Sequence, residues 1–182
     1  MGKQEHRTSL SGGVMADKTH PRVEFRGRMD SLCALVVELQ ILAERQGLAS
    51  LVGELEEAGS KLYDVLSCEV TGRECGDLFL WGMSGDEIRE RSHQPERYFG
   101  LGHIRPHYTM GPVAAGLNTL RTRIREAELS ACRAFAVPGA EDENTGRADI
   151  IKVLNRLSSA IYVLTYKYLP KDYDKTVRFS KS

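Results

Sequence analysis

Apolar residues recur every three to four positions along much of this chain, the spacing of one face of an α-helix. The pattern is clearest in the C-terminal half. One face there comprises Leu117, Leu120, Ile124, Ala127, Ala131 and Phe135, and a second comprises Ile150, Leu154, Leu157, Ile161, Leu164 and Tyr168. The two faces predict long helices over residues 113–136 and 147–169, the second of them stopped by Pro170.

The N-terminal half carries weaker versions of the same pattern. One stripe of leucine and valine begins at about Asp30, and another covers residues 48–66, where two glycines interrupt it. A capping box, Ser84 followed three residues later by Glu87, predicts a short helix over residues 84–93. Because no segment alternates with period two, we expect an all-α fold, a bundle of four or five helices.

These patterns divide the chain into three regions. Residues 1–21 form a polar, glycine-containing arm, and Pro21 disfavours helical geometry in the residue before it. Residues 22–170 hold the predicted helices and form one domain of ordinary size. Residues 171–182 form a polar tail.

Charge and composition exclude several classes of protein. The 182 residues carry 25 basic and 25 acidic side chains, so no net charge attracts nucleic acid or an anionic membrane. The longest apolar runs are too short to span a membrane, and the first residues lack the apolar core of a secretory signal. We therefore expect a cytoplasmic protein that binds neither nucleic acid nor a membrane.

The cysteines are widely spaced along the chain. Cys33, Cys68, Cys75 and Cys132 form no Cys-x-x-Cys pair with a nearby histidine, the usual pattern of a zinc site. For a cytoplasmic protein, reduced thiols are the expected state, and disulfides are the alternative.

The most specific chemical signal lies on the helix predicted over residues 113–136. Arg121, Arg125 and Glu128 are spaced at i, i+4 and i+7, so they share one stripe beside the apolar face. Two arginines one turn apart repel each other unless an anion lies between them. A polyphosphate would accept hydrogen bonds from both guanidinium groups, and Glu128 could orient an arginine or hold magnesium through water. The alternative is a solvated face with an Arg125–Glu128 ion pair.

Two other segments hold candidate ligands for a nucleotide. Asn155 falls beside the apolar face of the last helix, where it serves either an interhelical hydrogen bond or a bound ligand. The arm offers the hydroxyls of Thr8 and Ser9 and the ammonium group of Lys18. These are what a phosphate-binding segment needs, and the alternative is a polar tail without a site.

Residues 92–112 combine proline, glycine, histidine and aromatic residues, and a loop of this length is uncommon unless it is functional. Phe99, His103, Tyr108 and Met110 are its large side chains of interest. The spacing of the histidines matches no standard metal site. The loop therefore suits a large flat ligand as well as it suits a metal or an ordinary loop core.

Taken in order, these motifs resemble the ATP:cob(I)alamin adenosyltransferases. Residues 8–32 resemble the N-terminal signature of the propanediol-utilisation type. Residues 120–128 match its Arg-x-x-x-Arg-x-x-Glu element, and residues 154–164 match its Leu-Asn-Arg-Leu-Ser element. Residues 92–98 look closer to the ethanolamine-utilisation branch, and the whole resemblance covers about residues 8–169.

The resemblance implies a five-helix bundle that assembles as a trimer or dimer, with ATP at the subunit interface. It implies ATP ligands at Thr8, Ser9, Lys18, Arg121, Arg125, Glu128 and Asn155, and corrinoid contacts at Phe99, His103, Tyr108 and Met110. Arg121, Arg125 and Glu128 would form the catalytic group, and Glu128 would hold Mg²⁺ through water. Asp30 would pair with Arg121 in the subunit interface.

The implied reaction is an alkyl transfer, in which cob(I)alamin attacks C5′ of ATP and expels triphosphate. In the family an apolar wedge displaces the lower axial ligand of cobalt, and Phe99, Tyr108 and Met110 are the candidates here. A reductase and an adenosylcobalamin-dependent enzyme are candidate partners, and attachment to a bacterial microcompartment is a further alternative. The rival interpretations are a non-catalytic protein that binds and delivers corrinoid, and a helical adaptor.

Four departures from the family pattern affect these expectations, and the first is Gln4-Glu5-His6-Arg7 in place of the Thr-Gly-Asp that precedes the Gly/Thr loop. Glu126 stands where a second arginine is common, and Ser159 stands where many members have aspartate. The ethanolamine branch often carries a histidine upstream of a Cys-Cys-x-x-Cys cluster, which this sequence lacks. We therefore predict no structural zinc or iron.

Overall fold

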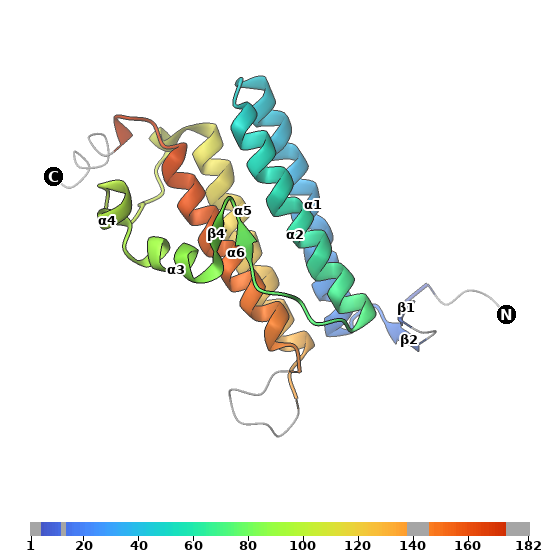
Figure 1. Ribbon diagram of the computed structural model, residues 1–182. Coiled ribbons are helices and arrows are strands. Elements are labelled where there is room, and N and C mark those ends of the chain that lie inside the picture. Colours follow the sequence, from blue (N-terminus) through green and yellow to red (C-terminus); the bar gives the residue numbers. More distant parts are fainter. Residues whose placement is uncertain (1–4, 12–13, 138–145, 174–182) are drawn as a thin grey trace.

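The computed structural model describes residues 5–11, 14–137 and 146–173. In chain order the elements are β1 (Arg7–Ser11), β2 (Val14–Asp17), α1 (Pro21–Arg45), α2 (Ala49–Thr71), β3 (Phe79–Leu80), β4 (Met83–Ser84), α3 (Gly85–His93), α4 (Pro95–Phe99), the 3₁₀ helix η1 (Tyr108–Met110), α5 (Gly111–Ala134) and α6 (Ala148–Lys167). Figure 1 shows the four long helices side by side, with α3 and α4 on one flank.

The core lies between the four long helices. α5 packs against α6 and α1, α1 also packs against α2, and α3 lies across α6 as a fifth packed helix. The fully buried side chains include Leu32, Leu62, Leu120, Ile124 and Leu154, which belong to the periodic faces of four helices. The predicted all-α bundle is confirmed. None of the described helices combines the length and apolarity needed to cross a membrane.

Helix α1 begins at Pro21, nine residues before the start that the apolar pattern predicts. The side chain of His20 caps it by accepting the N–H of Arg22 through Nδ1, and Pro21 occupies the first turn. Arg22 and Arg26 both donate to the buried carboxylate of Glu69 on α2. Because these charged residues interrupt the apolar pattern, the sequence does not predict the first turns of the helix, although Glu69 compensates both charges.

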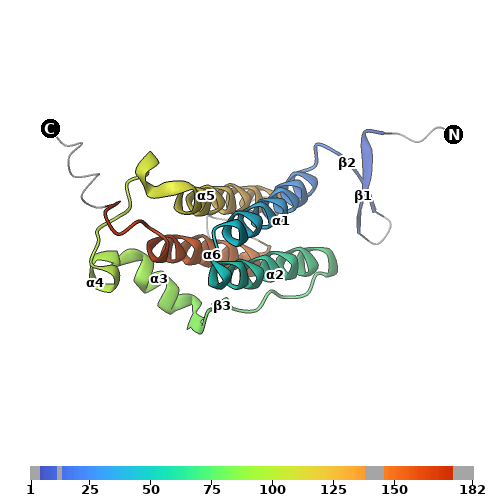
Figure 2. The ribbon, with the colours of Figure 1, turned by 90° about the horizontal axis from the view of Figure 1, so that it is seen from above.

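Two short hairpins correct the expectation that the chain holds no strand. β1 pairs antiparallel with β2, and β3 pairs antiparallel with β4. The first hairpin is formed by the segment expected to be an irregular arm, and β1 packs against α2. Figures 1 and 2 show it beyond the N-terminal end of α1, away from α6.

The capping box predicted at the start of α3 is confirmed. The hydroxyl of Ser84 accepts the N–H of Glu87, and the carboxylate of Glu87 accepts the N–H of Ser84. The other predicted helices differ from the observed bounds by a few residues. Residues 138–145, between the two predicted C-terminal helices, lie outside the described residues, as do residues 174–182 of the predicted tail.

Arg147 and Asp149 fix the connection from α2 to β3 onto the start of α6. Arg147 donates to the backbone carbonyls of Cys68 and Arg73, and Asp149 accepts the N–H of Cys75. The hydrogen bond from Arg147 lowers the pKa of Asp149 to about 2. This cluster holds an otherwise irregular segment against the core.

Candidate functional site

Arg121, Arg125 and Glu128 lie along α5 beside its buried face. Arg121 and Glu128 are partly buried, whereas Arg125 is exposed. Their neighbours toward the core, Leu120 and Ile124, are fully buried, so the three polar side chains run along the edge of the helix interface. We call these three residues, with Asn155 and Tyr162 of α6, the α5–α6 strip.

Asn155 joins the two helices of the strip. Its amide donates to Oε1 of Glu128 at 2.9 Å, and its carbonyl oxygen accepts Nη1 of Arg156 at 3.1 Å. Asn155 is exposed, so its amide would be hydrated without these bonds, and they are not needed to satisfy a buried polar group. They orient an accessible Asn–Glu pair at the surface, which a ligand can also contact.

Arg121 is held without a carboxylate partner among the described residues. Its Nε donates to the carbonyl oxygen of Asn118 at 3.1 Å, and its guanidinium lies 5.5 Å from the ring centroid of Tyr162. Burial and then the charge of Arg125 lower the pKa of Arg121. In the described part of the chain Arg125 has no hydrogen bond or ion pair of its own.

Two neighbouring guanidinium groups without an acid between them form a local excess of positive charge. The alternative read from the sequence, an Arg125–Glu128 ion pair, is wrong, because Glu128 bonds to Asn155 instead. An anion placed over both arginines would relieve their repulsion and accept hydrogen bonds from their guanidinium groups. The arrangement therefore suits an extended anion such as a polyphosphate.

Tyr162 connects this strip to the loop between α4 and η1. Its hydroxyl accepts the N–H of Ile104 at 3.0 Å and lies 3.1 Å from Nδ1 of His103. The same hydroxyl shares a hydrogen bond with that of Tyr166, which donates to the carbonyl of Gly102. Burial raises the pKa of Tyr166, so its phenol stays protonated as a donor.

The four loop residues expected at the corrinoid differ in their surroundings. Phe99 stacks on Tyr166 with centroids 4.5 Å apart, and His103 lies beside Tyr162. Tyr108 is 87% exposed, whereas Met110 is buried in a small cluster with Ala114 and Tyr173. Met110 thus anchors the loop, and Tyr108 offers an accessible ring.

The arm residues are not close to the α5–α6 strip within this chain. Thr8 and Ser9 lie on β1, and Lys18 follows β2, where its backbone N–H donates to His6. Ser9 and Lys18 are exposed. The hairpin that carries these residues lies beyond the N-terminal end of α1 (Figure 2).

Asp30 is exposed on α1 and forms no ion pair with Arg121 in the described chain. The pair implied by the resemblance was expected between subunits. It stays a prediction.

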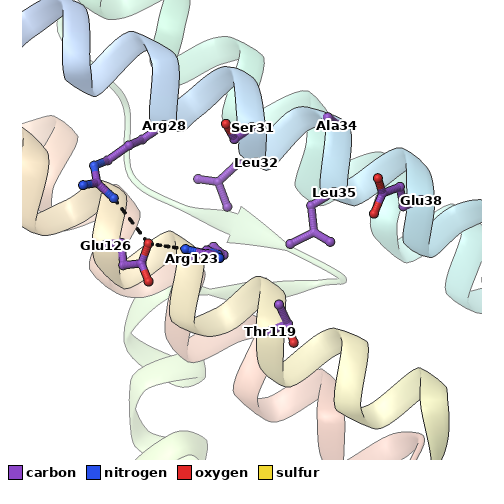
Figure 3. Close-up of a pocket in the computed structure, with 9 residues that line it drawn as sticks. All are labelled: Arg28, Ser31, Leu32, Ala34, Leu35, Glu38, Thr119, Arg123 and Glu126. Atoms are coloured by element: carbon purple, nitrogen blue, oxygen red, sulfur yellow. Dashed lines mark hydrogen bonds and ion pairs between the residues drawn. The ribbon is translucent and has the colours of Figure 1, made fainter.

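Glu126 belongs to a different surface from Arg125. It accepts hydrogen bonds from Arg28 of α1 and from Arg123, its neighbour on α5. Figure 3 shows the three side chains at one end of a groove between α1 and α5, a cavity of about 510 Å³. The carboxylate at position 126 thus cross-links two helices, and it does not weaken the positive charge of the strip directly.

Glu128 is the residue of the strip that fits a hydrated magnesium ion. Its Oε1 is engaged by Asn155, and Oε2 has no hydrogen-bond partner among the described residues. A single carboxylate oxygen beside an anion site is a normal ligand for Mg²⁺ or for its water shell.

Asp64, Cys68 and Cys75 form the one cluster of candidate metal ligands found in the described residues, with ligand atoms within 4.8 Å of one another. Lys61 and Arg73 already pair with Asp64, and burial raises the pKa of Cys75 to about 12. The two cations occupy the carboxylate of Asp64, and the raised pKa opposes the Cys75 thiolate that a metal would bind. All four cysteines are free, and the expected lack of a structural metal stays a prediction.

Tyr162 and Tyr166 are the site residues that the sequence analysis missed. Tyr162 lies seven residues after Asn155, two helical turns on the same face, so the spacing could have indicated it. No local signal indicates that its hydroxyl would meet Ile104, since that contact depends on how the loop folds back.

Fold and site together define an all-α bundle protein whose surface presents paired arginines, an oriented carboxylate and an aromatic loop in one continuous strip. Such a strip suits a ligand with a long anionic part and a neighbouring ligand with a flat apolar part. The chain belongs to the cobalamin adenosyltransferase family, whose sequence profile matches residues 2–168.

Individual proteins of known name agree with this membership. The corrinoid adenosyltransferase EutT of Escherichia coli strain K12 is 37% identical over 163 residues, which are 89% of this chain and 58% of that protein. Its counterpart in Salmonella typhimurium strain LT2 is 36% identical over the same shares. The chain therefore spans a little over half the length of the curated relatives it matches. No solved structure gives a significant match.

Proposed function

We propose that this protein transfers the 5′-deoxyadenosyl group of ATP to cob(I)alamin, as a corrinoid adenosyltransferase. The cobalt(I) centre supplies the electron pair that forms the Co–C5′ bond, the C5′–O bond breaks, and triphosphate leaves with the electron pair of that broken bond. Family membership and the named relatives support this activity. The observation on which it depends is the α5–α6 strip, where Arg121 and Arg125 lack an acidic partner among the described residues.

For this reaction the protein must stabilise the negative charge that develops on the departing triphosphate. Arg121 is positioned for this role by Asn118 and Tyr162, so it needs little reorganisation when the anion forms. Arg125 adds the second guanidinium one turn away. No general base is required, because the nucleophile is a metal centre and no proton is transferred.

Magnesium is part of the proposal because Glu128 has a free carboxylate oxygen beside the arginines. When bound with ATP, the ion would neutralise further charge on the phosphates. Asn155 holds Glu128 in place through its amide. The remaining nucleotide contacts would come from Asn155 itself.

The corrinoid is expected at the loop that Tyr162 and Tyr166 attach to α6. Phe99 and His103 lie against these tyrosines, so the loop is adjacent to the arginines without overlapping them. Among the candidates for the wedge below cobalt, Tyr108 has the most accessible ring, and Met110 is buried.

We also propose that the site is completed by a second copy of the chain. The hairpin with Thr8, Ser9 and Lys18 lies away from the strip of its own chain (Figures 1 and 2). A partner's hairpin could supply these groups to the phosphates, and the same contact could bring Asp30 to a partner's Arg121. A trimer or a dimer would satisfy this arrangement. Supply of reduced corrinoid by a reductase, transfer of product to an adenosylcobalamin-dependent enzyme and attachment to a microcompartment in the cytoplasm follow as further expectations.

The direct test is an optical assay of chemically reduced cobalamin with MgATP under anaerobic conditions. We expect the spectrum of cob(I)alamin to be replaced by that of an alkylcobalamin, and light should cleave the new Co–C bond. Corrinoid binding without turnover or ATP binding would instead identify a delivery protein. Binding of neither ATP nor corrinoid would favour the remaining interpretation, a helical adaptor.

A further inference from the structure

A second cavity lies between α6 and α3, next to the loop, and none of its lining residues is an arginine of the α5–α6 strip. Its volume is about 690 Å³, within the range of small-molecule sites. α2, the β3–β4 hairpin, α3, α4 and α6 all contribute to its walls. The site proposed above does not use it.

Trp81 forms one wall of this cavity and is held there by an unusual turn. With Gly82 it occupies the two central positions of the β3–β4 hairpin, and both residues have positive φ, 54° for Trp81 and 75° for Gly82. That conformation suits Asn-Gly and is costly for a bulky side chain. The indole N–H donates to the carbonyl of Glu54, and the backbone N–H donates to Glu57, so α2 fixes the ring in place.

Phe99 and Tyr166 form the wall shared with the corrinoid loop. Their rings are stacked, with an interplanar angle of 12°. Met83, Val163 and Leu164 add apolar surface. The interior thus favours a flat aromatic group, which would lie between aromatic side chains.

Of the two cations that line the cavity, Lys167 and Arg91, only Lys167 pairs with a carboxylate among the described residues. Lys167 pairs with Glu54 at 2.6 Å, and Glu54 also accepts the hydroxyl of Tyr168. Arg91 of α3 lies 5.2 Å from the ring centroid of Tyr98 and has no carboxylate partner among the described residues. An apolar cavity with one unpaired guanidinium group suits an aromatic ligand that carries a single negative charge.

We propose that this cavity receives the nucleotide tail of cobalamin after its benzimidazole base leaves cobalt, with the base between Trp81 and Phe99 and the phosphodiester at Arg91. The inference rests on the proposed function, because a displaced lower ligand needs a place beside the corrin site. The tail has the required chemistry, a flat apolar ring and one phosphodiester charge. Phe99 links the two sites, since this last residue of α4 directly precedes the loop and also lines the cavity.

The test compares cob(I)alamin with cob(I)inamide, which lacks the nucleotide tail. Arg91→Met should raise KM for cobalamin about tenfold and leave KM for cobinamide unchanged, and Arg91→Lys should restore most of the loss. Arg89→Met, an exposed arginine of the same helix, is the matched control and should alter neither value. Equal effects of Arg91→Met on both corrinoids, or no effect, would overturn the inference.

A binding measurement keeps the inference testable if no corrinoid is adenosylated. Trp81 is the only tryptophan of the chain, so its fluorescence reports on the cavity. Titration with the ribonucleotide of 5,6-dimethylbenzimidazole should change the emission saturably in the wild type and about tenfold more weakly in Arg91→Met. Saturable binding without turnover would reject the proposed function alone. No saturable change would reject the cavity as the tail site.

Discussion

At the scale of single residues, the account depends on two like charges that the fold leaves together. Arg121 and Arg125 repel each other, and the acid of the same strip, Glu128, is engaged by Asn155. A solvated face would be expected to pair these charges, as Arg123 and Glu126 do on the other side of the same helix. The difference between the two sides of α5 is what favours an anion site.

Replacing Arg125 by alanine should therefore weaken binding of MgATP by about 10- to 100-fold, because charged hydrogen bonds contribute about 1.5–3 kcal/mol each. Arg125 is exposed, so the unfolding midpoint should stay the same. Isothermal titration calorimetry measures the first effect and thermal unfolding the second. Arg123→Ala is the control and should bind MgATP normally; equal losses in both variants would refute the assignment.

Tyr162 tests the link between the arginines and the loop. Tyr162→Phe keeps the ring beside Arg121 but removes the hydroxyl that Ile104 and His103 contact. Hydrogen exchange at the amide of Ile104 should become faster, and kcat/KM for the corrinoid should fall while MgATP affinity is retained. Tyr63→Phe, at an exposed position on α2, serves as control. Unchanged exchange at Ile104 would show that the hydroxyl does not hold the loop.

At the scale of elements, the sequence predicts the long helices well because their buried faces are regular. It misses the start of α1, where Arg22 and Arg26 interrupt the apolar pattern and are compensated by Glu69, 43 residues away from the nearer of them. It also misses both hairpins. β3 and β4 contain two residues each, too few to show a pattern of period two. β1 and β2 are longer but mostly exposed, with Leu10 and Ala16 as their buried apolar residues, so they show no clear alternation. Long-range pairing is not visible in local periodicity.

The connection from α2 to β3 gives a prediction about pH. The folded-state pKa of Asp149 is about 2, below its ordinary value of 3.8. The ionised carboxylate therefore adds to the free energy of unfolding in full above pH 3.8, and this added stability is lost as the pH falls through about 2. Asp149→Asn should lower the free energy of unfolding at pH 7 by about 1–3 kcal/mol. That difference should shrink toward pH 2. Denaturant unfolding at several pH values measures it, with the exposed Asp77→Asn as control; a difference independent of pH would contradict this role.

The N-terminal hairpin gives a second prediction at this scale. Removal of residues 1–18 leaves the His20 cap and the Glu69 cluster in place, so the bundle should keep its helical circular dichroism and most of its stability. Binding of MgATP should be lost, because Thr8, Ser9 and Lys18 are then absent. Calorimetry of the truncated chain decides the point. Retained ATP affinity would show that the hairpin is not part of the nucleotide site.

At the scale of the whole molecule, the site residues divide into two groups. Arg121, Arg125, Glu128 and Asn155 come together on α5 and α6, as their helical spacing suggests. The hairpin and Asp30 do not reach this strip within one chain, and no sequence pattern reveals where a second chain would lie. Motif order along the chain could therefore indicate the ligands but could not show which copy supplies them.

Assembly can be tested through the proposed contact between Asp30 and a partner's Arg121. Asp30→Ala and Arg121→Ala should each shift sedimentation toward smaller species, and the double variant should be no worse than the more severe single one, as expected for one shared contact. Glu44→Ala, another exposed acid of α1, should sediment as the wild type. Normal sedimentation of both single variants would remove this pair from the interface.

The central claim is that the two arginines of the α5–α6 strip hold the triphosphate of ATP, and a crystal structure of the wild-type protein with MgATP tests it most directly. We predict phosphate oxygens within hydrogen-bond distance of the guanidinium groups of Arg121 and Arg125, with Glu128 beside the metal's water shell. A triphosphate bound elsewhere, with both arginines still facing solvent, would contradict the account.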